Sequence, residues 1–237
     1  MSLNQSDLSF LHESLPFWDR LSEQQKKLVE SSAVVRSHPA GSSLHNGSAD
    51  CAGLFLVKSG QVRTFVLSDA GREITLFRLF ERDICIFSAS CMLKNIRFDV
   101  FIEAAQDSET ILIPTSVYKN LNQNSLAVSD YTNQLLSSRF SDVVWLLEQI
   151  LFMSFDRRLA MFLLEESAIS GGDTLTTTHE EIAKNMGTAR EVVTRMLRYF
   201  QSEGLVRLSR GEVRILSRKG LEALSSQASR MPEPQNH

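Results

Sequence analysis

The spacing of hydrophobic positions changes along the chain, and this change divides the sequence into regions. Between residues 53 and 113, short apolar runs alternate with polar positions and are separated by turns that contain Gly60 and Gly71. Short strands at regular spacing are typical of a compact antiparallel barrel or jelly roll. The pattern predicts one short helix at residues 22–30 and strands at 53–59, 61–66, 72–79, 83–87, 99–105 and 110–113.

The pattern becomes helical from about residue 126 to 153, where neither Gly nor Pro interrupts the chain. Apolar residues in this run alternate steps of four and three, the spacing of a coiled-coil seam that requires a partner helix. They are Leu136, Phe140, Val143, Leu147 and Ile150. We expect a rod of about 40 Å whose seam packs against a partner helix. The alternative is a core helix that packs on its own domain.

Two helices joined by a glycine turn are predicted near the C-terminus. The first begins with a capping box between Thr178 and Glu181 and ends at Gly187, where a left-handed backbone costs little. The second begins at Thr188, which is expected to form another capping box with Glu191. This outline is that of a helix-turn-helix, preceded by a further helix that begins after residue 154.

The second of these helices has two faces. Val193, Leu197 and Phe200 recur at helical spacing and are expected to point inward, whereas the opposite face is charged or polar. That face holds Arg190, Glu191, Thr194, Arg195 and Arg198. The helix is followed by a predicted β-hairpin over residues 205–216 with Gly211 in its turn, so the helix-turn-helix carries a wing.

Composition and charge fit this organisation. The chain has 237 residues, of which 43% are hydrophobic and 22% charged, enough for two domains. Its net charge is −3, yet residues 176–224 hold nine Lys and Arg against six Glu, so this segment carries +3. A positive C-terminal segment suits the phosphates of nucleic acid. The N-terminus has no secretory signal pattern and no stretch spans a membrane, so we expect a cytoplasmic protein.

The order of these parts resembles the CRP/FNR family of bacterial transcription regulators. The resemblance rests on Gly-Leu-Phe-Leu-Val-Lys-Ser-Gly at 53–60, on the long helix, and on Met-Gly-Thr-Ala-Arg-Glu-Val-Val-Thr-Arg at 186–195. It covers about residues 17–224 and implies an α+β fold with a cyclic-nucleotide-binding-like β-roll. The expected parts are a sensor at 1–125, a dimerisation helix at 126–153, a winged helix-turn-helix at 154–226 and a disordered tail at 227–237.

The resemblance also implies a function and partners. A family member is expected to act as a homodimeric activator that binds double-stranded DNA, RNA polymerase and a small-molecule effector. Glu191 and Arg195 match the residues that the family places in the DNA groove, where carboxylate and guanidinium groups read cytosine and guanine. Arg190 and Arg198 are expected to contact phosphates. The remaining predicted DNA-binding residues are Thr178, Thr188 and Thr194.

Simpler roles stay open for the two base-reading residues, since Glu191 could serve only the capping box and Arg195 could be a solvated charge. The sensor departs from cyclic-nucleotide-binding relatives. Residues 83–99 lack their Gly-Glu pair and their Arg followed by Ser or Thr, and Asp99 falls where a phosphate would lie. We therefore expect an effector other than cyclic AMP, uncharged or aromatic. The predicted pocket residues are Ile86, Phe87, Met92 and Arg97.

Two alternative functions remain. Cys85 and Cys91 could form a thiol redox sensor, although a free cysteine is more often a small buried apolar residue. The chain could also be a cyclic-nucleotide-type regulatory module without DNA activity, which the winged helix argues against. The five histidines show no ligand spacing, so no metal or cofactor is expected. Neither a nucleophile nor an acid-base pair emerges, so no enzyme activity is predicted.

Overall fold

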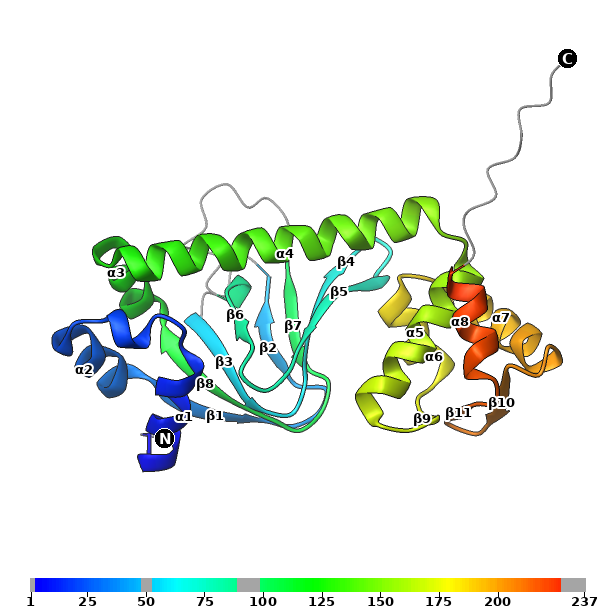
Figure 1. Ribbon diagram of the computed structural model, residues 1–237, viewed down its shortest axis with the longest axis horizontal. Coiled ribbons are helices and arrows are strands. Elements are labelled where there is room, and N and C mark those ends of the chain that lie inside the picture. Colours follow the sequence, from blue (N-terminus) through cyan, green and yellow to red (C-terminus); the bar gives the residue numbers. More distant parts are fainter. Residues whose placement is uncertain (1–2, 48–52, 89–98, 227–237) are drawn as a thin grey trace, which may run out of the picture. The chain divides into compact units, whose positions relative to one another are not determined.

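The structure is a computed structural model that describes residues 3–47, 53–88 and 99–226, and its fold is α+β (Figure 1). The chain divides into two compact units, and along the long helix α4 (Leu126–Phe152) the division falls between Val143 and Val144. The fold class predicted from the sequence is confirmed. The limits given above for the separate domains stay a prediction.

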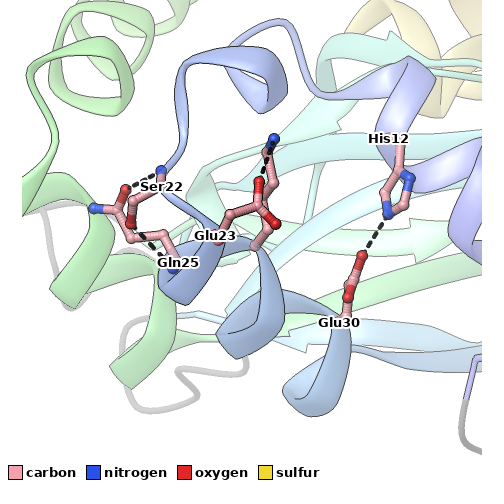
Figure 2. Close-up of polar contacts among 6 residues, drawn as sticks. His12, Ser22, Glu23, Gln25 and Glu30 are labelled. Atoms are coloured by element: carbon pink, nitrogen blue, oxygen red, sulfur yellow. Dashed lines mark hydrogen bonds and ion pairs between the residues drawn. The ribbon is translucent and has the colours of Figure 1, made fainter.

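The chain begins with two helices joined by a 3₁₀ turn. These elements are α1 (Gln5–Ser14), η1 (Trp18–Arg20) and α2 (Glu23–Ser32). A capping box between Ser22 and Gln25 fixes the start of α2, because each residue's side chain accepts a hydrogen bond from the other's backbone amide (Figure 2). Figure 2 also shows His12 of α1 bonded to Glu30 of α2, with 2.9 Å between Nε2 and Oε1.

Two four-stranded antiparallel sheets form the β-roll. One sheet has the order β1-β8-β3-β6, from β1 (Val34–His38), β8 (Ser108–Pro114), β3 (Gly53–Ser59) and β6 (Ile84–Cys85). The other has the order β2-β7-β4-β5, from β2 (Ser43–Asn46), β7 (Phe101–Ala104), β4 (Val62–Leu67) and β5 (Glu73–Leu79). The turn between β3 and β4 contains Gly60 at φ +82°, where a Cβ would lie 2.4 Å from the Asp107 carbonyl oxygen.

One apolar core fills the roll, and the helices that cover the roll pack against this core. Leu54, Leu56, Ile102, Ile111 and Ile113 are fully buried there. Helix α3 (Thr115–Asn124) adds buried side chains, and the first half of α4 lies along the roll (Figure 1). Its contributing residues are Ala127, Val128, Tyr131, Leu135 and Leu136. Strands β1 and β2 were not predicted from the sequence, and the strand expected at 83–87 is only the two-residue β6.

Beyond these residues, α4 exposes a line of apolar side chains. Phe140 is 70% exposed, Leu147 51% and Ile150 39%, while Val143 is half-buried. Leu136, the first residue of the predicted seam, is half-buried against the β-roll core. Along this line of residues, the exposed apolar surface therefore begins at Phe140. The α-helix predicted over 126–153 is confirmed to within one residue.

After the end of α4, the described part of the C-terminal unit contains four further helices and a small sheet. Its helices are α5 (Phe155–Ser170), α6 (His179–Met186), α7 (Arg190–Ser202) and α8 (Arg218–Ser226). The sheet has the order β10-β11-β9, from β10 (Val206–Ser209), β11 (Glu212–Ile215) and β9 (Thr174–Thr176). A separate apolar core joins them, centred on Leu159, Leu163, Ile182, Leu197 and Phe200. The predicted hairpin is confirmed, with β9 as an unpredicted third strand and α8 as an unpredicted helix.

Candidate DNA interface

Helix α6 begins where the sequence predicts. The Thr178 Oγ1 accepts a hydrogen bond from the Glu181 amide at 3.2 Å, and the Glu181 carboxylate accepts one from the Thr178 amide at 2.6 Å. Together these bonds satisfy two amide groups that the first turn of a helix leaves without backbone partners. The predicted capping box at Thr178 is therefore confirmed.

The turn between the two helices is tight, and it changes the start of the second. Gly187 ends α6 in the left-handed conformation at φ +64°, as predicted. The Thr188 amide then donates to the Ala183 carbonyl, so Thr188 still belongs to the turn that closes α6. Helix α7 begins at Arg190 with Ala189 as its N-cap, and no side chain caps it. The predicted capping box between Thr188 and Glu191 is wrong.

This correction removes the simpler role proposed for Glu191. Its carboxylate does not cap α7, and it has no polar partner among the described residues. The exposed face of α7 carries Glu191 together with Arg190, Arg195 and Arg198, all solvent-accessible. The opposite face buries Val193, Leu197 and Phe200 completely. Glu191 and Arg195 on this charged face make no hydrogen bond or ion pair within the described part of the chain, so both side chains are free to contact another molecule.

Thr194 joins the two helices of the motif. Its Oγ1 donates a hydrogen bond to the Arg190 carbonyl at 2.9 Å and lies 2.9 Å from Nδ1 of His179, the first residue of α6. Burial lowers the pKa of His179, and the nearby Arg190 and Arg198 lower it further. His179 was not singled out from the sequence. Its position directly after the Thr178 cap was the only available signal, since the contact with Thr194 depends on how the helices dock.

A cavity of about 440 Å³ lies between the start of α6 and the turn of the wing. Two cations border it, Arg190 from α7 and Arg210 from the wing turn, and two carboxylates, Glu180 and Glu212. Its remaining lining residues are Thr177, Thr178, His179, Ser209 and Gly211. The cavity therefore brings the first helix, the second helix and the wing to one place, with hydroxyl groups and charges on its walls.

The wing adds further basic side chains. Arg207 of β10 and Arg214 of β11 are direct cross-strand partners, and both are exposed. Like charges placed opposite one another destabilise an isolated hairpin. An anion bound near them would relieve this repulsion.

The predicted sensor residues are only partly described. Ile86 and Phe87 are buried in the β-roll core, and the Phe87 ring lies 5.8 Å from that of Phe77. Met92 and Arg97 lie outside the described residues, as does Cys91. Cys85 is fully buried, and this burial raises the pKa of its thiol. A buried thiol with a raised pKa is a poor nucleophile, which argues against a redox role for Cys85.

Two further features of the described residues concern membrane-spanning helices and clusters of metal-binding side chains. None of the helices in the described chain combines the length and the apolar character that crossing a membrane requires. Within the described ranges, no three His, Cys, Asp or Glu side chains gather where they could hold a metal ion.

Comparison with known proteins identifies this architecture. Residues 157–224 match the Crp-like helix-turn-helix domain. A solved structure from Eubacterium rectale, described as a transcriptional regulator of the crp/fnr family, is 52% identical and superposes with a TM-score of 0.89. The match covers 91% of this chain and 100% of that one. The chain belongs to the CRP/FNR family. This CRP/FNR protein is accordingly a DNA-binding transcription regulator.

Curated relatives extend over most of the CRP/FNR chain. The cyclic AMP receptor protein of Thermus thermophilus is 27% identical over 210 residues, which are 89% of this chain and 96% of the relative. The transcriptional activator protein FnrA of Stutzerimonas stutzeri is 29% identical over 208 residues, 82% of each chain. The names of these relatives differ, so they support the regulator class without specifying an effector.

Proposed function

We propose that this CRP/FNR protein is a homodimer that reads a palindromic DNA site through helix α7. The observation that carries the proposal is the exposed face of α7, where Glu191 and Arg195 lie one helical turn apart without polar partners among the described residues. An Arg fork pairs with guanine O6 and N7, and a Glu carboxylate accepts from cytosine N4. Arg190 and Arg198 would contact phosphates, which position a protein without specifying sequence.

Dimerisation is supported by α4. Phe140, Val143, Leu147 and Ile150 repeat at coiled-coil spacing, and three of them are at least 39% exposed in a single chain. Large apolar side chains in such a line are stabilised when a second helix covers them. Two copies of α7 would then meet half-sites about one helical turn of DNA apart. We propose that each half-site contains a TGA-like core. We also propose that the protein acts in the cytoplasm as an activator that contacts RNA polymerase.

The effector is proposed to be a small molecule other than cyclic AMP. Residues 83–99 lack the phosphate-binding pattern of cyclic-nucleotide relatives, and Asp99 is exposed. Ile86, Phe87 and Met92 are apolar, which favours an uncharged or aromatic ligand, with Arg97 available for one carboxylate. Such a ligand acts only if it binds the DNA-competent arrangement more tightly than the other arrangement.

Selection of binding sites from a random pool of DNA duplexes tests the proposal. The full-length protein should enrich palindromic sequences, and the enrichment should change in the presence of a cognate effector from a panel of small aromatic compounds and carboxylates. Parallel selections with oxidant and reductant would reveal redox gating. Recovery of random sequence under every condition would contradict sequence-specific binding.

A further inference from the structure

The hydrogen bonds around His179 determine which of its ring nitrogens carries the proton. The Thr194 hydroxyl donates its hydrogen to the Arg190 carbonyl at 2.9 Å. Its oxygen can therefore only accept from His179, so Nδ1 of the ring, 2.9 Å away, is the donor. In the neutral ring Nε2 is then an acceptor, and protonation turns Nε2 into a second donor.

The charges around the cavity balance only while His179 is neutral. Arg190 and Arg210 supply two positive charges, and Glu180 and Glu212 supply two negative charges. One proton on His179 therefore changes the net charge of the lining from zero to +1. Hydroxyl groups of Thr177, Thr178 and Ser209 add neutral donors to the same walls. A small oxygen-rich anion matches such a lining after His179 is protonated.

We propose that this cavity is a proton-dependent subsite for a DNA backbone phosphate, which His179 binds through Nε2 only in its protonated form. The inference rests on the proposed function, since the phosphate belongs to bound DNA. Under this proposal, the start of α6 and the turn of the wing form a contact with DNA whose strength depends on pH. Contacts to phosphate carry no base information, so the effect should appear on DNA of any sequence.

The surroundings of His179 set the direction of the pH effect. In the free protein, burial lowers its pKa, and Arg190 and Arg198 of α7 act in the same direction. Arg210 of the wing turn adds a further positive charge. The acidic groups of the neighbouring elements are Glu180 and Glu181 of α6, Glu191 of α7 and Glu212 of β11. A bound phosphate would raise the pKa. Because the bound state then holds the proton more tightly, DNA affinity should rise as pH falls through the bound-state pKa.

Proton titration of His179 by NMR in the full-length protein tests this directly, with His179→Gln to assign the signal. A random-sequence duplex should raise the pKa of His179 by roughly one unit. An unchanged or lower pKa in the complex would overturn the proposal. A rise produced by inorganic phosphate alone, without a rise on duplex, would also overturn the assignment to DNA.

Binding measurements provide a second readout. Affinity for the random duplex should increase roughly ten-fold from about pH 7.5 to about pH 5.5 in the wild type, which corresponds to one unit of pKa change. His179→Gln should remove this dependence, and His179→Lys should bind tightly at both pH values. His12→Gln, which removes a histidine of the N-terminal helices, should retain it. Equal pH dependence in His179→Gln would contradict a role for this proton.

The two proposals fail in different ways. If no duplex binds at either pH, then the proposed DNA-binding function fails, and the phosphate subsite fails with it. If duplex binds well but independently of the His179 proton, then the proposed function stands and only the subsite is wrong. Thermal unfolding of His179→Gln and His179→Lys should match the wild type, since Gln and Lys each retain a donor for the Thr194 hydroxyl oxygen.

Discussion

Arg195 follows Glu191 by one turn of α7, and both side chains are exposed on the face opposite the buried Val193 and Leu197. The start of α7 at Arg190 matters here, because no side chain caps the helix and the Glu191 carboxylate is therefore not used in a capping box. Two complementary charged groups at this spacing can address adjacent base pairs in a major groove.

The cap of α6 should contribute measurably to stability. Thr178→Ala removes the acceptor for the Glu181 amide and should lower the free energy of unfolding by about 1 kcal/mol. Thr178→Ser keeps the hydroxyl and should retain most of the stability. Urea unfolding followed by circular dichroism is the measurement, and equal stability of the Ala and Ser variants would show that the capping box contributes nothing.

The apolar line on α4 should hold two subunits together. Replacing both Phe140 and Leu147 with Glu places charges where a partner helix would bury them, and the dimer should dissociate. Trp145→Glu is the matched control, because Trp145 is similarly exposed, at 53%, but lies off the seam. Sedimentation equilibrium distinguishes the two, and an intact dimer in the double variant would contradict the assigned interface.

Loss of the dimer should also weaken DNA binding. Two half-sites engaged together increase apparent affinity through effective concentration, which a monomer cannot exploit. The Phe140/Leu147 double variant should therefore lose operator affinity by at least about ten-fold while its helix-turn-helix stays folded. Undiminished affinity would indicate that one subunit suffices.

Cys85 should react slowly. Burial raises its pKa, so the thiolate fraction at neutral pH is below that of an exposed thiol, and alkylation should slow by at least about ten-fold relative to unfolded protein. Iodoacetamide labelling followed by mass spectrometry measures the two rates. Oxidant-sensitive DNA binding that disappears in Cys85→Ser would contradict this account.

Cyclic AMP should neither bind tightly nor change DNA affinity. The Gly-Glu and Arg-Ser or Arg-Thr pairs of its receptors do not occur in residues 83–99, and Asp99 would repel its phosphate. Calorimetry with the full-length protein measures binding directly. Tight binding accompanied by stronger operator binding would show that the sensor was misjudged.

Local signals in the sequence predicted much of the local structure of the helix-turn-helix. The Thr178–Glu181 box, Gly187 and the buried face of α7 each follow from residues close together in the chain. The start of α7 was misjudged because the Thr188 amide is engaged by Ala183 across the turn. The sequence alone could not place this bond.

Contacts between distant segments could not be predicted from the sequence either. Strand β9 is three residues long and polar at both ends, so it has no periodicity of its own and forms only by pairing with β11. The contact between His179 and Thr194 requires α6 and α7 to be docked. Leu136 fits both a seam and a core, and only the packed β-roll shows that it contacts the core.

Base reading by Arg195 is the central claim, and the affinities of Arg195→Ala and Arg198→Ala for the selected operator and for random DNA test it most directly. Arg195→Ala should lose about 1 to 3 kcal/mol on the operator, relax the preference at one base, and lose little on random DNA. Arg198→Ala should weaken binding to both duplexes alike, as a phosphate contact does. Equal loss on operator and random DNA for Arg195→Ala would contradict the account.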